Sequence, residues 1–476
     1  MNQLAKTAGI VVIAVVLVVL VWATAPVAPE LDRFDDQGEP FYPDFTDPLK
    51  AASLEVIDYD EESGTARPFK VQFKDGVWSI PSHYDYPADG EDRLAATAAG
   101  VIDLKKDVIQ SDRGRDHEVL GVIDPLDETT PTLTGRGQRV TLRDQAGAVL
   151  ADFIIGHEAE GKQGFRYVRL PDKKRTYAVK VDVDLSTRFA DWIETNVLDV
   201  SSYNITEVQV DDYTINEQTG RVESAGSIQL ARDEANKWRL ADLPEGRELD
   251  EAKVRSMLSA VSGLTITGVR PKPEALTADL RAKENLNLDL PTRLSLQSKG
   301  FFISHDGRLL ANEGDVTVGT KNGVRYTLRF GEVLYGEGLA VSAGSENEAE
   351  TGEFESGESG ETGQTENRYL FVTAIFDEAL LPPRPVPPAE GAAETESVEE
   401  PSEEETADPA MSAYEQELAA WEEQVEEGRE KAGKLNDRFA AWYYVISAED
   451  FQNIRLDMEQ LTKEAKDPQT QPPAAR

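Results

Sequence analysis

Residues 78–109 read WSIPSHYDYPADGEDRLAATAAGVIDLKKDVI, and residues 238–269 read WRLADLPEGRELDEAKVRSMLSAVSGLTITGV. The two stretches keep step at an offset of 160 residues without a gap. In this register Leu94 falls on Val254, and the apolar stripe of a helix continues in both copies. The match predicts that one structural module is built twice along the chain.

The order of apolar and polar residues predicts strands, then a helix, then strands again in each copy. This order is typical of an α+β fold with mostly antiparallel pairing. We expect module one over residues 51–200 and module two over residues 201–476. Trp78 and Trp238 occupy equivalent strand positions, which predicts core residues; ligand stacking is the alternative.

Composition excludes several classes of function. The 476 residues include no cysteine, which rules out disulfides and cysteine-based zinc or redox sites. The net charge of -40 argues against a nucleic-acid partner, which needs clustered Lys and Arg. Two runs, residues 345–366 and 389–408, hold acidic residues and no Lys or Arg, and are predicted to be solvated linkers.

The N-terminus predicts a membrane anchor. Residues 7–29 carry no charge, and this length can span a hydrocarbon core of roughly 30 Å. Lys6 lies before the apolar run and acidic residues follow it, so we expect residues 1–29 to be a cytoplasmic tip and anchor. Residues 30–50 would form a stalk. A cleaved signal peptide is the alternative, although Pro26 disfavours it.

This topology predicts a single-pass protein of the inner (cytoplasmic) membrane. The bulk of the chain would then lie outside the cytoplasm, in the periplasm. The expected partners are the membrane and other membrane or envelope proteins, and the oligomeric state stays open.

Module two differs from module one by two insertions. An acidic low-complexity segment covers residues 338–367, and a Pro/Glu linker followed by a long helix covers residues 377–440. The strand at 442–446 is predicted to pair with the strand near Tyr369 across this second insertion.

The long helix carries an apolar seam with heptad spacing. It either folds back onto module two or projects toward another protein; the bulky Trp421 disfavours a dimeric coiled coil. The candidate interaction surface on this seam is Tyr414, Leu418, Trp421, Val425, Leu435 and Phe439.

Residues 156–163 (GHEAEGKQ) have the spacing of a phosphate-binding loop. Gln163 stands where the Mg²⁺-binding hydroxyl belongs, and the next segment alternates like a strand. Module two repeats the glycines, Gly331 and Gly336, with Glu337 in place of the lysine. The shared glycines predict hairpin-loop geometry and no nucleotide.

The remaining candidates for chemistry are weak. The histidines are scattered without chelating spacing and are interpreted as surface residues: His83, His117, His157 and His305. The Asp182–Asp184 pair lacks a Ca²⁺-loop pattern. No catalytic residue, metal site or cofactor is therefore predicted.

Several features occur together: an N-terminal anchor, strands ending in W-x-I at Trp78 and W-x-L at Trp238, and strands ending at Gly156 and Gly331. Y-V-x-L follows at Tyr167. This combination resembles the uncharacterised bacterial domain-of-unknown-function family 4340, over roughly residues 50–200 and 205–461. Genes of that family often lie beside ABC transporters of the gliding-motility type. The resemblance implies an extracytoplasmic accessory protein and supplies no catalytic residue.

We expect a non-enzymatic, membrane-anchored accessory or scaffold protein, as part of an ABC-transporter-linked cell-envelope system. The alternative is an extracytoplasmic binding protein for an envelope polymer or peptide. A weaker alternative is a carboxylate-dependent envelope hydrolase, which needs paired carboxylates with one raised pKa.

Overall fold

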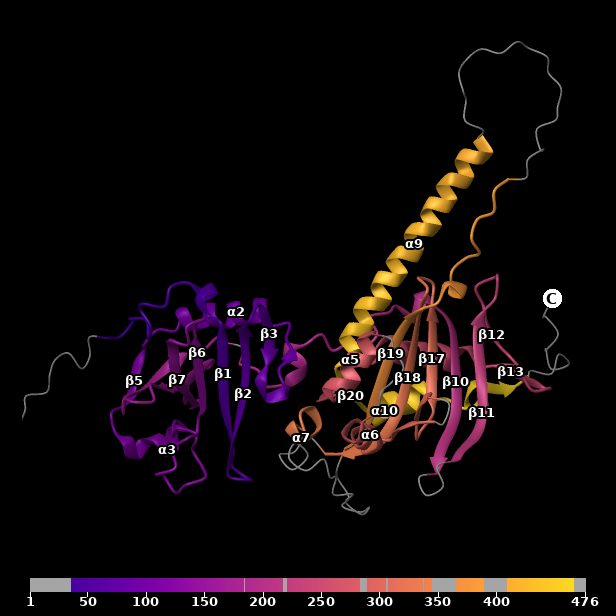
Figure 1. Cartoon of the computed structure of the whole chain (residues 1–476). Helices are drawn as coiled ribbons and strands as arrows, with labels where there is room; N and C mark the ends of the chain where they lie inside the picture. Colours follow the sequence, from indigo (N-terminus) through magenta and orange to yellow (C-terminus); the bar gives the residue numbers. More distant parts are fainter. Residues whose placement is uncertain are drawn as a thin grey trace, which may run out of the picture. The chain divides into compact units, whose positions relative to one another are not determined.

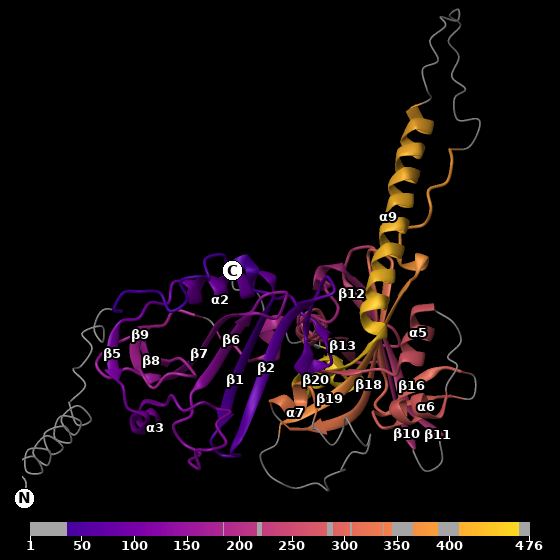
Figure 2. The ribbon, with the colours of Figure 1, turned by 60° about the vertical axis from the view of Figure 1, so that its left-hand side comes forward.

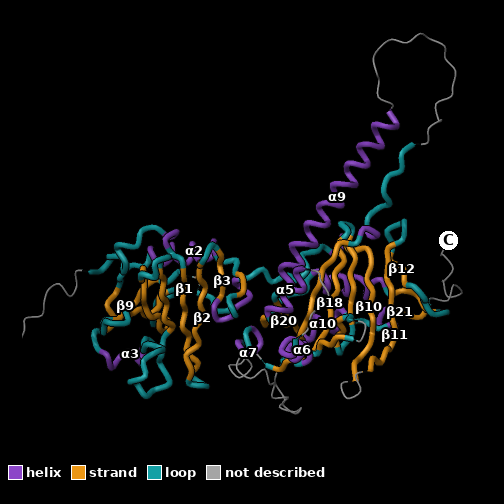
Figure 3. Tube along the Cα trace, in the orientation of Figure 1, coloured by secondary structure: helices purple, strands orange, loops and turns teal. Residues whose placement is uncertain are grey.

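The computed structural model describes residues 36–183, 185–216, 221–282, 289–304, 307–336, 338–344, 365–388 and 409–465. Within these ranges the chain forms antiparallel sheets covered by helices (Figure 3). The predicted α+β class with antiparallel pairing is confirmed.

The first sheet has nine strands in the order β4-β3-β2-β1-β6-β7-β8-β9-β5. Its helices are α2 (Glu91–Ile102) and α3 (His117–Leu120). Asp75 and Gly76, both with positive φ, form the hairpin turn between β2 and β3. The strands are β1 (Ser53–Asp60), β2 (Thr65–Lys74), β3 (Val77–Ile80), β4 (Tyr86–Pro87), β5 (Val108–Ser111), β6 (Gln138–Arg143), β7 (Val149–Glu158), β8 (Phe165–Arg169) and β9 (Thr176–Lys180).

The second sheet has eight strands in the order β12-β11-β10-β17-β18-β19-β20-β14 (Figure 1). The small hairpin β15 (Phe301–Ile303) and β16 (Leu309–Ala311) lies apart from it, as does the pair β13 (Arg247–Leu249) and β21 (Thr462–Glu464). The eight strands are β10 (Ile205–Asn216), β11 (Arg221–Arg232), β12 (Trp238–Leu240), β14 (Gly268–Pro271), β17 (Asp315–Thr320), β18 (Val324–Tyr335), β19 (Glu366–Phe376) and β20 (Trp442–Ser447).

Several helices accompany the second sheet. They are α4 (Glu251–Ser262), α5 (Glu274–Ala282), α6 (Leu290–Gln297), α7 (Leu339–Ser342), α9 (Pro409–Ala440), α10 (Ala448–Ile454) and α11 (Met458–Leu461). Phe330 on one face of the sheet packs edge-on against Phe451 of α10. The opposite face carries a core of Phe301, Phe371 and Tyr443 beneath α6 and the β15–β16 hairpin.

The two sheets share one strand order. Apart from the extra edge strand β4, each strand of the first sheet has a counterpart at the same place in the second. In the chain, β5 follows helix α2 and β14 follows helix α4. Each of these strands forms the edge of its sheet opposite β3 or β12. Helices α2 and α4 bury the stripe that the sequence predicts, with Leu94 and Val254 at equivalent places.

By its contacts the chain divides into two compact units. The first comprises Met1–Lys70 and Glu91–Leu185, and the second comprises Val71–Gly90 and Ser186–Arg476. This division differs from the predicted boundary after residue 200, because residues 186–200 and residues 71–90 both belong to the second unit. Tyr86, for example, lies edge-on against Trp442 at 4.9 Å.

Neither repeated tryptophan is fully buried, so their prediction as core residues needs correction. Trp78 is half-buried beside Phe73 at 5.2 Å. Trp238 is half-buried beneath the guanidinium of Arg232, 5.0 Å from the ring centroid. Both lie near a sheet edge, where a flat ring covers neighbouring strands and leaves one side in water.

The described part of the predicted stalk is not extended. Phe41 and Phe45 are buried in the first unit. The Tyr42 hydroxyl donates to the backbone carbonyl of Asp152 at 2.6 Å. The aromatic residues that seemed to belong to a stalk therefore anchor residues 36–50 to the sheet.

The predicted membrane anchor lies outside the described residues. Among the residues that are described, no helix is both long and apolar enough to span a bilayer.

Both predicted insertions occupy the predicted connections between strands of the second sheet. Tyr335 pairs with Glu366, so β18 and β19 form a hairpin around the acidic segment. The predicted insertion limits are too wide, because Leu339–Ser342 forms α7 and Val341 is buried. Tyr369 pairs with Val445, which confirms the predicted pairing of β19 with β20 across the long helix.

Candidate functional site

The apolar seam of α9 divides into two halves with different surroundings. Val425, Leu435 and Phe439 are only 7%, 7% and 1% exposed. These three predicted interaction residues are buried within this chain and do not form a free surface. Tyr414, Leu418 and Trp421 stay half-buried in the half of α9 that extends beyond the sheet in both views (Figures 1 and 2).

The C-terminal half packs on the sheet because a glycine lets it approach closely. A side chain at Gly428 would overlap the carbonyl oxygen of Asn322 and the ring of Phe376. Arg438 then donates to the backbone carbonyls of Glu194 at 3.1 Å and Asn196 at 2.8 Å. Gly428 is a seam position, where a glycine would weaken a coiled coil. In this protein it lets α9 pack closely on the sheet.

The N-terminal half is supported by a proline-rich strap, residues 382–388, which runs beside it (Figure 1). The Trp421 indole donates to the Pro382 carbonyl at 2.9 Å. Arg384 lies over the same ring at 5.6 Å and pairs with Glu422 at 3.5 Å. Because proline fixes φ, the strap is stiff, and it supports a helical arm that lacks a sheet beneath it.

A pocket of about 580 Å³ lies where the strap meets α9. Val425 and Trp421 supply its apolar surface. Its charged lining residues are Glu378, Arg384, Glu422, Glu426 and Arg429. We define the arm surface as the outer seam of Tyr414, Leu418 and Trp421 together with this pocket.

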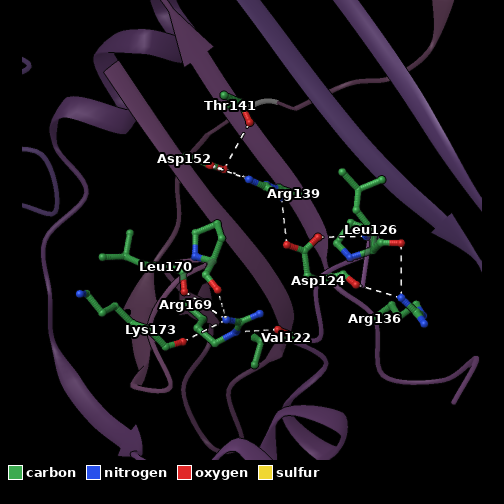
Figure 4. Close-up of polar contacts among 12 residues, drawn as sticks. Val122, Asp124, Leu126, Arg136, Arg139, Thr141, Asp152, Arg169, Leu170 and Lys173 are labelled. Atoms are coloured by element: carbon green, nitrogen blue, oxygen red, sulfur yellow. Dashed lines mark hydrogen bonds and ion pairs between the residues drawn. The ribbon is translucent and has the colours of Figure 1, made fainter. Parts of the chain in front are cut away.

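The first sheet carries a half-buried polar cluster that sequence reasoning missed (Figure 4). Arg139 binds the Asp152 carboxylate through two hydrogen bonds, at 3.0 and 2.7 Å. Its third nitrogen donates to Asp124 at 3.0 Å, and the Thr141 hydroxyl donates to Asp152. The bond to Asp152 is the largest cause of the raised Arg139 pKa. Arginine and carboxylate satisfy one another here and leave little charge for a ligand.

Arg169 holds the loops around this cluster. Its guanidinium donates to the backbone carbonyls of Val122, Leu170, Pro171 and Lys173 at 2.8 to 3.1 Å (Figure 4). Burial lowers the pKa of Arg169. With four backbone carbonyl partners, Arg169 has a structural role: it fixes the positions of these loops.

The row of cross-strand partners that contains Arg139 and Arg169 has a counterpart in the second sheet, where different charged residues occupy it. Ile57, Arg139, Ile154 and Arg169 are successive cross-strand partners in the first sheet. The corresponding row of the second sheet is Asp211, Asp315, Arg329 and Phe371.

Arg329 resembles Arg169 in its role, because it donates to the Leu309 carbonyl of the covering hairpin at 3.0 Å. Burial raises the pKa of Asp315 to about 6, and Arg329 opposes that shift.

Asp211 and Asp315 are cross-strand partners, and the Asp211 charge adds slightly to the raised pKa of Asp315, as a hydrolase would need of its carboxylate pair. Asp211 accepts hydrogen bonds from Ser227 at 2.7 Å and from Gln209. Asp315 lies close to Tyr213, whose hydroxyl accepts a hydrogen bond from the backbone of the covering β16 strand at 3.2 Å. The Asp211 carboxylate is bonded to Ser227 and Gln209, and the Asp315 carboxylate lies close to Tyr213 and Arg329. These contacts favour a structural role.

Lys272, which follows strand β14 of the second sheet, is also buried, with 6% of the residue exposed. Its ammonium donates to the Phe439 carbonyl at 2.8 Å and lies 3.6 Å from the Phe371 ring centroid. Within the described residues no carboxylate reaches ion-pair distance of Lys272. Burial, with a smaller effect of Arg329, holds the pKa of Lys272 well below its usual value.

The four glycines of the phosphate-loop pattern divide into two kinds. Gly161 and Gly336 lie in loops with positive φ, as predicted, whereas Gly156 and Gly331 lie in strands, which corrects their prediction as hairpin-loop residues. Gly156 is in β7 and Gly331 is in β18, and neither has a positive φ. A Cβ at Gly156 would overlap the Leu120 carbonyl oxygen, and one at Gly331 would overlap that of Lys299. The segment after Gly161 is strand β8, so no helix presents its N-terminus to a phosphate.

Each glycine also receives the same hydrogen bond. Arg166 donates to the Gly156 carbonyl at 2.9 Å, and Arg368 donates to the Gly331 carbonyl at 2.8 Å. The Arg-Tyr dipeptides at 166–167 and 368–369 were the available sequence signal for this shared pair.

The histidines are dispersed, but His83 is not a surface residue. It is 1% exposed, stacks on Phe189 at 4.3 Å, and bonds Ser82 and Ser342 through its two nitrogens. Burial, and then the charge of Arg270, lower its pKa to about 4, so it is a weak base for activating Ser342.

His117 and His157 bond the backbone carbonyls of Lys174 and Val119, and His305 lies outside the described residues. Across the described ranges no group of three metal-ligating side chains occurs.

Comparison with protein families gives one match. Residues 78–287 match the family described as Domain of unknown function (DUF4340). These residues belong to the DUF4340 family. The predicted resemblance is confirmed, and the DUF4340 match includes both of the repeated stretches that begin at Trp78 and Trp238. Neither curated proteins nor solved structures gave a match to the chain.

Proposed function

We propose that this DUF4340 protein is a membrane-anchored extracytoplasmic accessory or scaffold subunit without catalytic activity. The observation that carries the proposal is the arm surface of α9. A helix that extends beyond its own sheet, held straight by a proline strap, serves to present a surface to another protein. At 1.5 Å per residue, residues 409–424 reach about 24 Å past the packed half.

We also propose that the body of the protein is a tandem duplication behind an N-terminal transmembrane anchor. The shared strand order and the two glycine–arginine pairs support the duplication. The uncharged run at residues 7–29 supports the anchor. The module without the arm would supply a rigid base, and the module with it would supply the contact.

A partner in an ABC-transporter-linked envelope system fits this arrangement, because such a partner lies in the same membrane. The polymer-binding alternative predicts binding to isolated envelope glycans without any protein partner. The Asp211–Asp315 pair, already bonded to neighbouring side chains, and the weakly basic His83 give the hydrolase alternative little support.

The arm can be tested without unfolding the protein. We expect the full chain, purified in mild detergent, to retain membrane or envelope proteins that mass spectrometry identifies. Tyr414→Ser combined with Leu418→Ser should lose most of them, because these residues lie on the outer seam.

Gln416→Ser combined with Glu423→Ser is the matched control on the opposite side of the same helix segment, and it should retain the partners. The proposal fails if no membrane or envelope protein is enriched. It also fails if the seam and control variants retain the partners equally.

A further inference from the structure

We infer that the arm surface binds a basic amphipathic helix of a partner protein. This inference rests on the proposed function and names the chemistry of the partner. It follows from the charges beside the seam, which change sign along α9.

The extending half is uniformly acidic. Residues 409–428 contain six Glu and no Lys, Arg or His. Glu415, Glu417 and Glu422 directly adjoin the seam residues Tyr414, Leu418 and Trp421. In a helix pair these flanking positions meet the flanking positions of the partner and select its charge.

In the packed half of α9, the positions that flank the seam carry basic residues instead of glutamates. Arg429 pairs with Glu378 at 3.8 Å, and the Lys431 ammonium donates to the Asp199 carbonyl. Arg438 donates to backbone carbonyls, so these flanking cations are used within the chain. The flanking carboxylates of the outer half have no comparable set of basic partners there, because Arg384 pairs with Glu422 alone among the three.

A second copy of the chain does not fit this surface. Only the outer half of α9 has seam residues that are partly accessible, since Val425, Leu435 and Phe439 are buried. Either orientation of two outer halves would place glutamates against glutamates, which repel. A partner helix with an apolar seam and flanking Lys or Arg avoids this repulsion.

The pocket beside the arm fits a cation from such a helix. Among its lining residues, Glu378 and Glu422 already pair with Arg429 and Arg384. Glu426 is the remaining acidic lining residue, next to Val425 at the base of the seam. A partner Lys could place its methylenes on Val425 and Trp421 and its ammonium near Glu426.

The test uses two synthetic peptides of about three heptads with the same leucine seam. One has Lys at the flanking positions, and the other has Glu. Calorimetric titration into the full chain in neutral detergent, corrected for detergent alone, should show at least about tenfold tighter binding of the Lys peptide.

Glu415→Lys combined with Glu417→Lys should weaken that binding about tenfold. Glu423→Lys combined with Glu427→Lys changes the net charge equally on the side away from the seam, and should have little effect. Higher salt should weaken the wild-type interaction.

Equal binding of both peptides, or equal effects of the two charge-reversed variants, would overturn the inference. So would sedimentation that shows the chain dimerising through the seam, with loss of the dimer in Leu418→Ser. These outcomes leave co-purification of a membrane partner untouched, so failure here is distinguishable from failure of the proposed function.

Discussion

Replacement of Lys272 by methionine is expected to raise the free energy of unfolding of the second unit at pH 7 by about 2 kcal/mol. The ammonium has one carbonyl partner and aromatic neighbours, and no carboxylate among the described residues reaches it. Methionine has a similar length and suits a pocket formed by Phe371 and Tyr443. Removing an uncompensated buried charge therefore relieves a desolvation cost.

The pH dependence gives this prediction its sign. The pKa of Lys272 is lowered in the folded chain from an unfolded value of 10.5, so between the two pKa values the unfolded chain binds more protons. The wild type should therefore gain stability as pH rises through that window. The advantage of Lys272→Met should shrink between pH 7 and pH 9.

Chemical denaturation at both pH values measures this effect, with hydrogen exchange assigning the transition to the second unit. Lys299→Met is the matched control, because Lys299 is half-exposed beside the same Tyr443 ring at 5.3 Å. It should change stability by less than about 0.5 kcal/mol. A destabilised Lys272→Met would show instead that the bond to the Phe439 carbonyl outweighs the cost of burial.

Alanine at Gly156 or at Gly331 is expected to destabilise the unit that contains it by about 3 kcal/mol. The cause is steric overlap with a backbone carbonyl oxygen, of Leu120 or of Lys299, and not backbone conformation. A backbone atom beneath a covering loop cannot move aside as a side-chain tip can. The loop must shift, and the arginine bond to the same glycine carbonyl is disturbed with it.

Two other glycines serve as controls. Gly433→Ala in α9 and Gly114→Ala both place the new Cβ where no atom lies within 4 Å. Gly433→Ala should even stabilise the helix by up to about 1 kcal/mol. Hydrogen exchange should show each strand glycine variant loosening its own unit. A neutral effect at either strand glycine would contradict the equivalence of the two positions.

Local pattern was enough to predict most elements of the fold. The apolar stripe that includes Leu94 and Val254 marked both equivalent helices, because a stripe at helical spacing must face a core. Apolar alternation likewise indicated β19 and β20, although a long helix separates them. The offset between the copies predicted one arrangement twice, and the observed strand order matches in the two sheets.

The buried and half-buried polar residues could not be predicted from such patterns. Arg139, Arg169, Asp315 and Lys272 look like surface residues in the sequence, since charged side chains are rarely buried. Their burial depends on loops distant in sequence, such as the segment after α3 and the β15–β16 hairpin. The shared glycines were visible in the sequence. At Gly156 and Gly331 the physical reason for glycine was not visible, because it is the close approach of a loop and not a turn.

The long helix α9 shows most clearly which features the sequence determines and which the tertiary structure determines. Sequence by itself determined that the segment of α9 (Pro409–Ala440) forms a helix with one apolar seam, since spacing along a helix is a local property. Only the tertiary structure decided that Phe439 is buried while Tyr414 and Leu418 lie on an extending arm. That choice depends on where the sheet ends, on the approach allowed by Gly428, and on the strap that reaches Trp421. Periodicity says which residues share a face, and tertiary packing decides how much of that face the chain itself covers.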